Sequence, residues 1–129
     1  MAARILIVED NKANLALVEY LLTRAGHQTL VATDGVEAVR LARQTHPDLV
    51  LCDLQVPVLD GYEVLEQLRG DPELSGLPVV AVTAFSMRGD RAYVLEAGFE
   101  GYIPKPIEPE TFVEQVEAYL RPELRSRRE

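Results

Sequence analysis

The amino-acid sequence predicts an α/β fold: a doubly wound, five-stranded parallel sheet with five helices on its two faces. Short apolar runs rich in valine and isoleucine alternate five times with segments of helical periodicity along the 129 residues. This alternation is typical of strands joined by helical crossovers, which produce a parallel sheet. The apolar runs are nearly continuous, as in strands that are buried on both faces, so helices are expected on both sides of the sheet.

Five strands are expected, near residues 5–8, 29–32, 49–52, 79–82 and 101–104. The run at 29–32 is shorter and flanked by polar residues, as in an edge strand. Doubly wound sheets of five strands commonly have the flavodoxin-like order 2-1-3-4-5, in which the first and third strands are neighbours. A crevice then forms between the carboxyl ends of these two strands, where ligands of parallel sheets bind.

Helical periodicity predicts five helices, near residues 12–25, 35–45, 61–69, 86–97 and from about 109 onward. A glycine follows the first and the fourth of these ranges, as is typical at the end of a helix. Pro109 is favourable in the first turn of the last helix, whose Val113, Val116 and Leu120 are expected to face the core. The helix at 86–97 has the poorest apolar stripe of the five.

Composition and charge narrow the class of function. The net charge of −8 argues against nucleic acid as a direct partner. No apolar stretch approaches the roughly 18 residues that a membrane span needs. Met1 leads almost directly into the first strand, which leaves no room for a signal peptide, so a cytoplasmic location is expected. The single cysteine, Cys52, is interpreted as an inert core thiol because it lies inside an apolar run. His27 and His46 are expected at the surface.

Chemically active side chains stand where the predicted strands end. Glu9 and Asp10 follow the first strand, Asp53 the third, Thr83 the fourth and Lys105 the fifth. The carboxyl ends of parallel strands meet at one edge of the sheet, so these side chains should converge. Three carboxylates repel one another unless a cation intervenes, and an all-oxygen site suits Mg²⁺. One carboxylate can then attack a phosphoryl group and form an aspartyl phosphate, with an ammonium and a hydroxyl on the phosphoryl oxygens.

Four stretches carry a resemblance to a known family: residues 5–11 (ILIVEDN), 48–61 (DLVLCDLQVPVLDG), 82–84 (VTA) and the pair Lys105-Pro106. With these motifs, residues 4 to about 120 resemble the receiver domain of two-component response regulators. The segments at 10–14 and 81–90 are similar to those of single-domain regulators of the cell-cycle type. Glu9 stands where many members of the family have Asp, and Val56 where Met is frequent.

The resemblance implies a phosphoacceptor and a set of metal ligands. Asp53 would accept the phosphoryl group. Asp10 and Asp53 would bind Mg²⁺ (or Mn²⁺) directly, and Glu9 largely through water. The backbone carbonyl of Gln55 would complete the protein ligands, and the side chain of Gln55 would help to set the lifetime of the phosphate.

The same resemblance implies a switch. Thr83 and Lys105 would bind the phosphoryl oxygens, and the Lys105–Pro106 peptide bond would be cis. Thr83 would be drawn towards the phosphoryl group and Tyr102 would turn inward, which would remodel the face formed by the fourth helix, fifth strand and fifth helix. Two residues that follow Thr83 would affect the rates of phosphorylation and dephosphorylation. Ala84 is small and leaves a path for a phosphodonor, and the bulky Phe85 could shield the phosphate from water.

The implied partners are a sensor histidine kinase or phosphotransfer protein and an unidentified downstream effector protein, with the chain a monomer or a weak, phosphorylation-dependent dimer. A receiver domain is expected over residues 1–120, followed by a basic tail or linker stub at 121–129 that holds four arginines against two glutamates. A stand-alone regulator is favoured over the N-terminal receiver of a larger regulator or kinase.

Three rival functions agree less well with the sequence. The best-known family of phosphohydrolases that work through an aspartyl phosphate places an Asp two residues beyond the nucleophile as general acid, and Gln55, which stands there, cannot take that role. A flavin or nucleotide module would need backbone amides that cradle phosphate, and no dinucleotide or P-loop motif is present. An inactive receiver is disfavoured by the complete set of site residues. No enzymatic activity is expected beyond gaining a phosphoryl group from a donor and losing it again.

Overall fold

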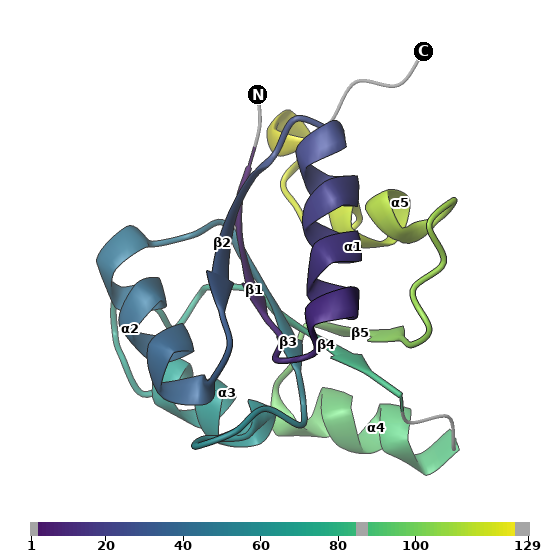
Figure 1. Cartoon of the computed structure of the whole chain (residues 1–129). Coiled ribbons are helices and arrows are strands. Elements are labelled where there is room, and N and C mark those ends of the chain that lie inside the picture. The colour runs from purple at the N-terminus through teal and green to yellow at the C-terminus, as the bar shows by residue number, and fades with distance from the viewer. Residues whose placement is uncertain (1–2, 85–87, 126–129) are drawn as a thin grey trace.

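The computed structural model describes residues 3–84 and 88–125, and its five strands form one parallel sheet in the order β2-β1-β3-β4-β5 (Figure 1). The strands are β1 (Arg4–Val8), β2 (Gln28–Ala32), β3 (Leu49–Asp53), β4 (Val79–Thr83) and β5 (Gly101–Pro104). The fold class, the strand order and the edge position of the strand near 29–32 are therefore confirmed. β1 and β3 are direct neighbours, with Val8 paired to Cys52, so the two carboxyl ends at the centre of the sheet lie side by side.

Helices cover both faces of the sheet, as Figure 1 shows. They are α1 (Lys12–Arg24), α2 (Gly35–Thr45), α3 (Gly61–Arg69), α4 (Arg88–Ala97), α5 (Phe112–Glu117) and the short 3₁₀ helix η1 (Pro122–Leu124). One core cluster, the α3-side cluster, joins the sheet to α2, α3 and α4 and includes Val64 and Val94. The other, the α1-side cluster, joins the opposite face to α1 and α5 and includes Leu22 and Phe112.

Three helices begin at a side-chain cap close to the carboxyl edge of the sheet. Asn11 accepts the N–H of Asn14 at the start of α1, and Asp34 accepts the N–H of Glu37 at the start of α2. At the start of α3, Asp60 forms a reciprocal capping box with Glu63. Such caps satisfy N–H groups that have no partner within the helix, so they fix where each strand-to-helix connection ends.

Helix α5 begins later than the sequence predicts. The N–H groups of Thr111 and Phe112 both donate to the carbonyl of Glu108, which closes a turn over 109–111 before the helix begins at Phe112. Pro109 therefore lies in this turn and not in the first turn of α5. The aromatic ring of Phe112 is fully buried, whereas the predicted core residue Val113 is only half-buried.

His27 is buried, so its predicted surface position was wrong, whereas His46 is exposed as predicted. Gly26, with a positive φ of 94°, follows the end of α1 and precedes His27. The Nδ1 of His27 accepts the N–H of Ala3 at 3.0 Å, and its Nε2 lies 2.6 Å from Oε2 of Glu117. A polar side chain is tolerated in the core when it is paired in this way.

The tail expected after residue 120 is partly described. Leu124 is buried in the α1-side cluster, and the guanidinium of Arg125 donates to the carbonyl of Leu120. The division into a domain of residues 1–120 and a tail of 121–129 stays a prediction. Cys52 is fully buried, as expected of an inert core thiol, and burial raises its pKa far above the ordinary value. None of the described helices is long and apolar enough to cross a membrane.

Candidate functional site

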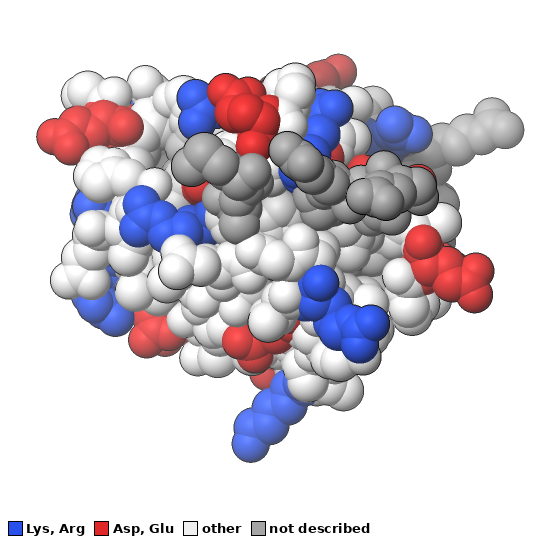
Figure 2. All heavy atoms as spheres, turned by 90° about the horizontal axis from the view of Figure 1, so that it is seen from above, with Lys and Arg blue, Asp and Glu red and all other residues white. Residues whose placement is uncertain are grey.

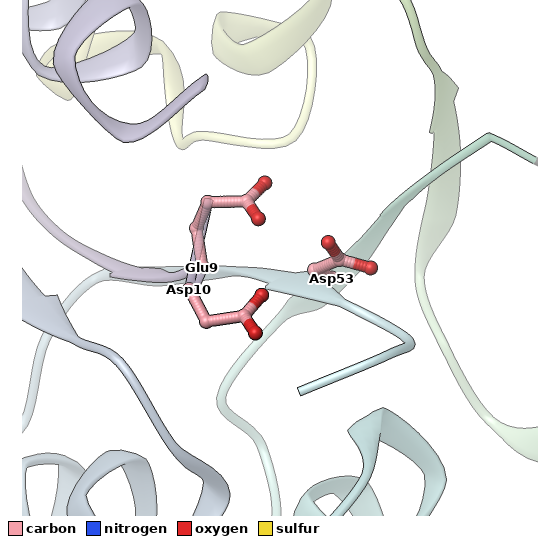
Figure 3. Close-up of side chains that lie close together, drawn as sticks. All are labelled: Glu9, Asp10 and Asp53. Atoms are coloured by element: carbon pink, nitrogen blue, oxygen red, sulfur yellow. The ribbon is translucent and has the colours of Figure 1, made fainter. Parts of the chain in front are cut away.

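Three carboxylates meet at the carboxyl ends of β1 and β3, as predicted. Glu9 and Asp10 follow β1 and Asp53 ends β3, and Figure 3 shows the three side chains directed towards one space. A carboxylate oxygen from each lies within 4.8 Å of the others. Glu9 and Asp53 are buried and Asp10 is exposed. Two of the carboxylates are thus buried in the crevice, and the third lies on its solvent side.

Lys105 reaches this cluster from the end of β5. Its Nζ lies 2.7 Å from Oδ2 of Asp53 and 2.8 Å from Oε1 of Glu9. Burial alone would lower the pKa of Lys105, but its hydrogen bonds to Asp53 and Glu9 outweigh burial and raise the pKa. The ammonium therefore stays charged and offsets part of the repulsion between the carboxylates.

Burial is also the main reason that the pKa of Glu9 lies above its ordinary value of 4.5. The charge of Asp53 raises this pKa further, while hydrogen bonds from Lys105 and from the backbone N–H of Asn11 oppose the increase. Burial disfavours the charged form of this carboxyl, and a cation in the cluster would favour it.

Backbone amides hold the remaining carboxylate oxygens in place. The N–H of Gln55 donates to Oδ1 of Asp53 at 2.9 Å, and the N–H of Asn11 donates to Oε2 of Glu9 at 3.2 Å. Asp53 is therefore held through one oxygen by the loop that follows it and through the other by Lys105. The sequence did not predict these amide contacts, because a backbone N–H leaves no signal in residue type.

Thr83 lies at the end of β4, and its carbonyl accepts the N–H of Lys105 at 2.8 Å. Residues alternate between the two faces of a strand, so Thr83 shares a face with Val79 and Ala81 of the α3-side cluster. Tyr102 is half-buried and packs against that same cluster. The two predicted switch residues thus lie on the face of the sheet that carries α4.

Three further predictions concern the neighbours of the site. The Lys105–Pro106 peptide bond is cis, as predicted. Ala84 is exposed beside Thr83, and its effect on access of a phosphodonor stays a prediction. Phe85 lies outside the described residues, so its shielding role stays a prediction.

The arrangement fits a hard divalent cation. The converging donors are all oxygens, and Mg²⁺ takes few carboxylates and keeps several waters. Asp10 is exposed and faces the two buried carboxylates, so a cation could enter from solvent and contact it first. A cation bound here would share Asp53 with the Lys105 ammonium, which also contacts Glu9.

The opposite end of the strands looks different. Figure 2 shows that end, where the coloured basic and acidic side chains are interspersed. A cavity of about 540 Å³ opens among the loops there, lined among others by His46, Asp48 and Arg121. This cavity lies at the other end of the strands from the carboxylate cluster, so the converging carboxylates do not line it.

Comparisons with known proteins agree with the geometry of the site. The family model for the response regulator receiver domain matches residues 5–117. The polar-differentiation response regulator DivK of Brucella ovis is 44% identical over 120 residues, which cover 93% of this chain and 98% of DivK.

Solved structures of similar proteins include two that hold a metal. The receiver domain of the sensor histidine kinase PA1611 of Pseudomonas aeruginosa, crystallised with a magnesium ion in its active site cleft, is 33% identical with a TM-score of 0.83 over 92% of this chain and 98% of that one. The Mn²⁺-bound response regulator Rcp1 is 30% identical with a TM-score of 0.76 over 90% of each chain. With its matching sequence and its sheet of the same kind, this chain belongs to the response regulator receiver domain family.

Proposed function

We propose that this chain accepts a phosphoryl group on Asp53 in a reaction that depends on Mg²⁺ or Mn²⁺, and that it signals through the change this causes. The observation that carries the proposal is the setting of Asp53: its two oxygens are held by the Gln55 N–H and the Lys105 ammonium beside Glu9 and Asp10. Magnesium and manganese in similar receivers support the choice of metal.

In the proposed transfer, a carboxylate oxygen of Asp53 attacks phosphorus in line with the leaving group. The new bond is a carboxyl O–P bond; the bond from phosphorus to the donor breaks, and the leaving group departs with its electron pair and takes a proton from solvent. A bound divalent cation would neutralise charge on the phosphoryl oxygens. Lys105 supplies a second positive charge at the same oxygens, and Thr83 supplies a hydroxyl donor. Asp10 and Asp53 would hold the cation directly, Glu9 through water, and Gln55 through its carbonyl.

The switch is proposed to pass from Thr83 to α4. Thr83 and Tyr102 occupy the face that carries α4, and a phosphoryl group on Asp53 would favour the packing in which Thr83 moves towards it. Tyr102 would then fill the space that Thr83 leaves. The changed surface would be formed by α4, β5 and α5, and an effector protein would bind there.

The proposed role in the cell is that of a single-domain response regulator. This chain spans 98% of the length of DivK, whose name describes a response regulator of polar differentiation. A sensor histidine kinase or phosphotransfer protein would supply the phosphoryl group in the cytoplasm. The receiver of a larger regulator or kinase is the second candidate, since the similar PA1611 domain comes from a sensor histidine kinase. Catalysis is proposed to be limited to the chain's own phosphorylation and dephosphorylation.

Incubation with acetyl phosphate and Mg²⁺ tests this proposal. Intact-mass measurement should show one added, base-labile phosphoryl group, which Asp53→Asn abolishes. Asp60→Asn is the matched control, because Asp60 is an exposed carboxylate nearby and Asn also caps helices well. Labelling that survives Asp53→Asn, or that proceeds undiminished in excess chelator, would contradict the proposal.

A further inference from the structure

The loop between β3 and α3, residues 54–60, contains a strained turn next to the site. The N–H of Leu59 donates to the carbonyl of Pro57 at 2.9 Å, which closes a three-residue turn around Val58. Val58 has a φ of 72°. A β-branched residue is disfavoured at such a positive φ, and a turn of this kind is rare. The side chain of Val58 is 72% exposed, so burial of its own apolar surface does not stabilise the turn. Other contacts must therefore hold it.

Gly35, the first residue of α2, makes those contacts. Its N–H donates to the same Pro57 carbonyl at 3.1 Å. The backbone of the loop passes so close that a Cβ at position 35 would lie 2.2 Å from the carbonyl oxygen of Leu59 and 2.5 Å from its Cβ. Atoms cannot approach this closely, so only glycine allows α2 and the turn to be in contact.

The same loop carries the backbone groups of the site. At its start, the N–H of Gln55 donates to Oδ1 of Asp53, and at its end the N–H of Gly61 donates to the carbonyl of Leu54 at 2.9 Å. Only Val56 separates Gln55 from Pro57, whose carbonyl accepts the N–H of Gly35. A displacement of the turn would thus move the Gln55 carbonyl and the amide that orients Asp53.

We propose that Gly35 is a positioning residue for the metal site: it holds the turn at 57–59 and so fixes the Gln55 carbonyl and the orientation of Asp53. The proposal rests on the function proposed above, since it assigns the metal site to this crevice. It adds a residue from α2, which contributes no ligand, to the determinants of metal affinity.

Titration with Mn²⁺ by calorimetry tests the proposal on the whole chain, with Gly35→Ala compared to Gly76→Ala. Gly76 is a matched control, because a Cβ there would meet nothing within 4 Å. Loss of an outer contact to a metal site typically lowers affinity about 10–100-fold, and we expect at least about tenfold for Gly35→Ala and no change for Gly76→Ala. A folded Gly35→Ala protein that is less stable but binds Mn²⁺ like the wild type would overturn the proposal. A wild type that does not bind Mn²⁺ would instead refute the metal site itself.

Amide exchange in the wild type covers the case in which Gly35→Ala does not fold. Coupling between two equilibria is reciprocal. If fixing the loop at 57–59 strengthens metal binding, then metal binding must stabilise that loop by the same free energy. Saturating Mg²⁺ should slow exchange of the Gly35 and Leu59 amides several-fold. The amide of Gly70, which donates to Glu66 at the far end of α3, is the internal control. Equal slowing of Gly35 and Gly70, or no slowing at Gly35, would overturn the proposal.

Discussion

The loop that follows β3 and the helix that follows the neighbouring strand β4 are held to the rest of the molecule in opposite ways. After β3, the loop at 54–60 is tied by backbone hydrogen bonds at its start, middle and end, and it enters α3 through a reciprocal capping box. After β4, the chain enters α4, where Val94 alone is buried among the side chains described at residues 91–97. Tyr93 and Leu95, on either side of it, are 63% and 43% exposed.

This difference separates two tasks that one site must combine. The proposed metal and phosphoryl group would need donors at fixed positions, and the β3 side would supply some of them from a loop that cannot move without breaking several contacts. The proposed signal would need an element with two arrangements of similar free energy, and a helix with a single buried side chain over residues 91–97 costs little to move. We call the loop at 54–60 and α3 the fixed side, and α4 the movable side. Since Asp53 ends β3 and Thr83 ends β4, the two sides meet at the proposed phosphoryl position.

The largest expected effect comes from the same substitution made on each side. Val64 of α3 and Val94 of α4 are both fully buried in the α3-side cluster, and both can be changed to Ala. Val64→Ala should lower the free energy of unfolding by about 2–3 kcal/mol, because the surrounding contacts prevent the cavity from closing. Val94→Ala should lower it by only about 1 kcal/mol, because α4 can shift into the space. Urea unfolding followed by circular dichroism measures both.

Amide exchange distinguishes this explanation from a simple difference in packing. In Val94→Ala, the α4 amides should exchange faster while those of α3 keep their protection relative to global unfolding. Equal losses of stability in the two variants, with α4 exchanging only through global unfolding, would show that α4 is held as firmly as α3.

The fold and the composition of the site could be predicted because both depend on patterns that are local in sequence. Five apolar runs place the strands, and the common strand order then brings Glu9, Asp10 and Asp53 together. Lys105 follows from the same rule at the end of β5. The poor apolar stripe predicted for the helix at 86–97 is seen over residues 91–97, where Val94 alone is buried.

What could not be predicted depends on contacts between distant residues. His27 is buried because it meets Ala3 and Glu117, which are 24 and 90 residues away. The contact of Gly35 with the turn at 57–59 is invisible in sequence for the same reason. The start of α5 was placed at Pro109 from a local preference, but burial of Phe112 and the hydrogen bonds to Glu108 placed it three residues later.

An effect of intermediate size concerns the charge of Glu9, which follows β1. Burial raises the pKa of Glu9 above 4.5, so the folded protein without metal keeps this proton at a pH where the unfolded chain has lost it. Deprotonation of Glu9 therefore lowers folding stability as the pH rises from 4.5 through the raised pKa. A cation favours the carboxylate, so Mg²⁺ affinity should increase over that window, by up to about tenfold per pH unit.

The variant Glu9→Gln isolates this contribution, since other carboxyls also titrate in the same range. Calorimetric titration with Mg²⁺ across the window should give a flatter pH dependence for Glu9→Gln than for the wild type. Parallel pH profiles would mean that Glu9 keeps its proton when the metal binds and does not act on the cation.

The smallest expected effect tests what holds the movable side in place. The ring of Tyr93 on α4 lies 5.4 Å from that of Tyr62 on α3 at 57°, and Tyr62 also meets Phe99 edge-on at 5.7 Å. Such ring pairs contribute about 0.5–1.5 kcal/mol, which corresponds to about 2–10-fold in an opening equilibrium. Tyr93→Leu should therefore speed exchange of the α4 amides by about that factor and leave the exchange of the α1 amides unchanged.

Tyr20→Leu is the matched control, because Tyr20 is a similarly exposed tyrosine on α1. If Tyr93→Leu leaves α4 exchange unchanged, the ring contact does not hold α4; if Tyr20→Leu speeds it equally, the effect is not local. A selective change would identify the aromatic contact between α3 and α4 as the link between the fixed and the movable side, and hence as a place where the switching equilibrium can be adjusted without altering the site.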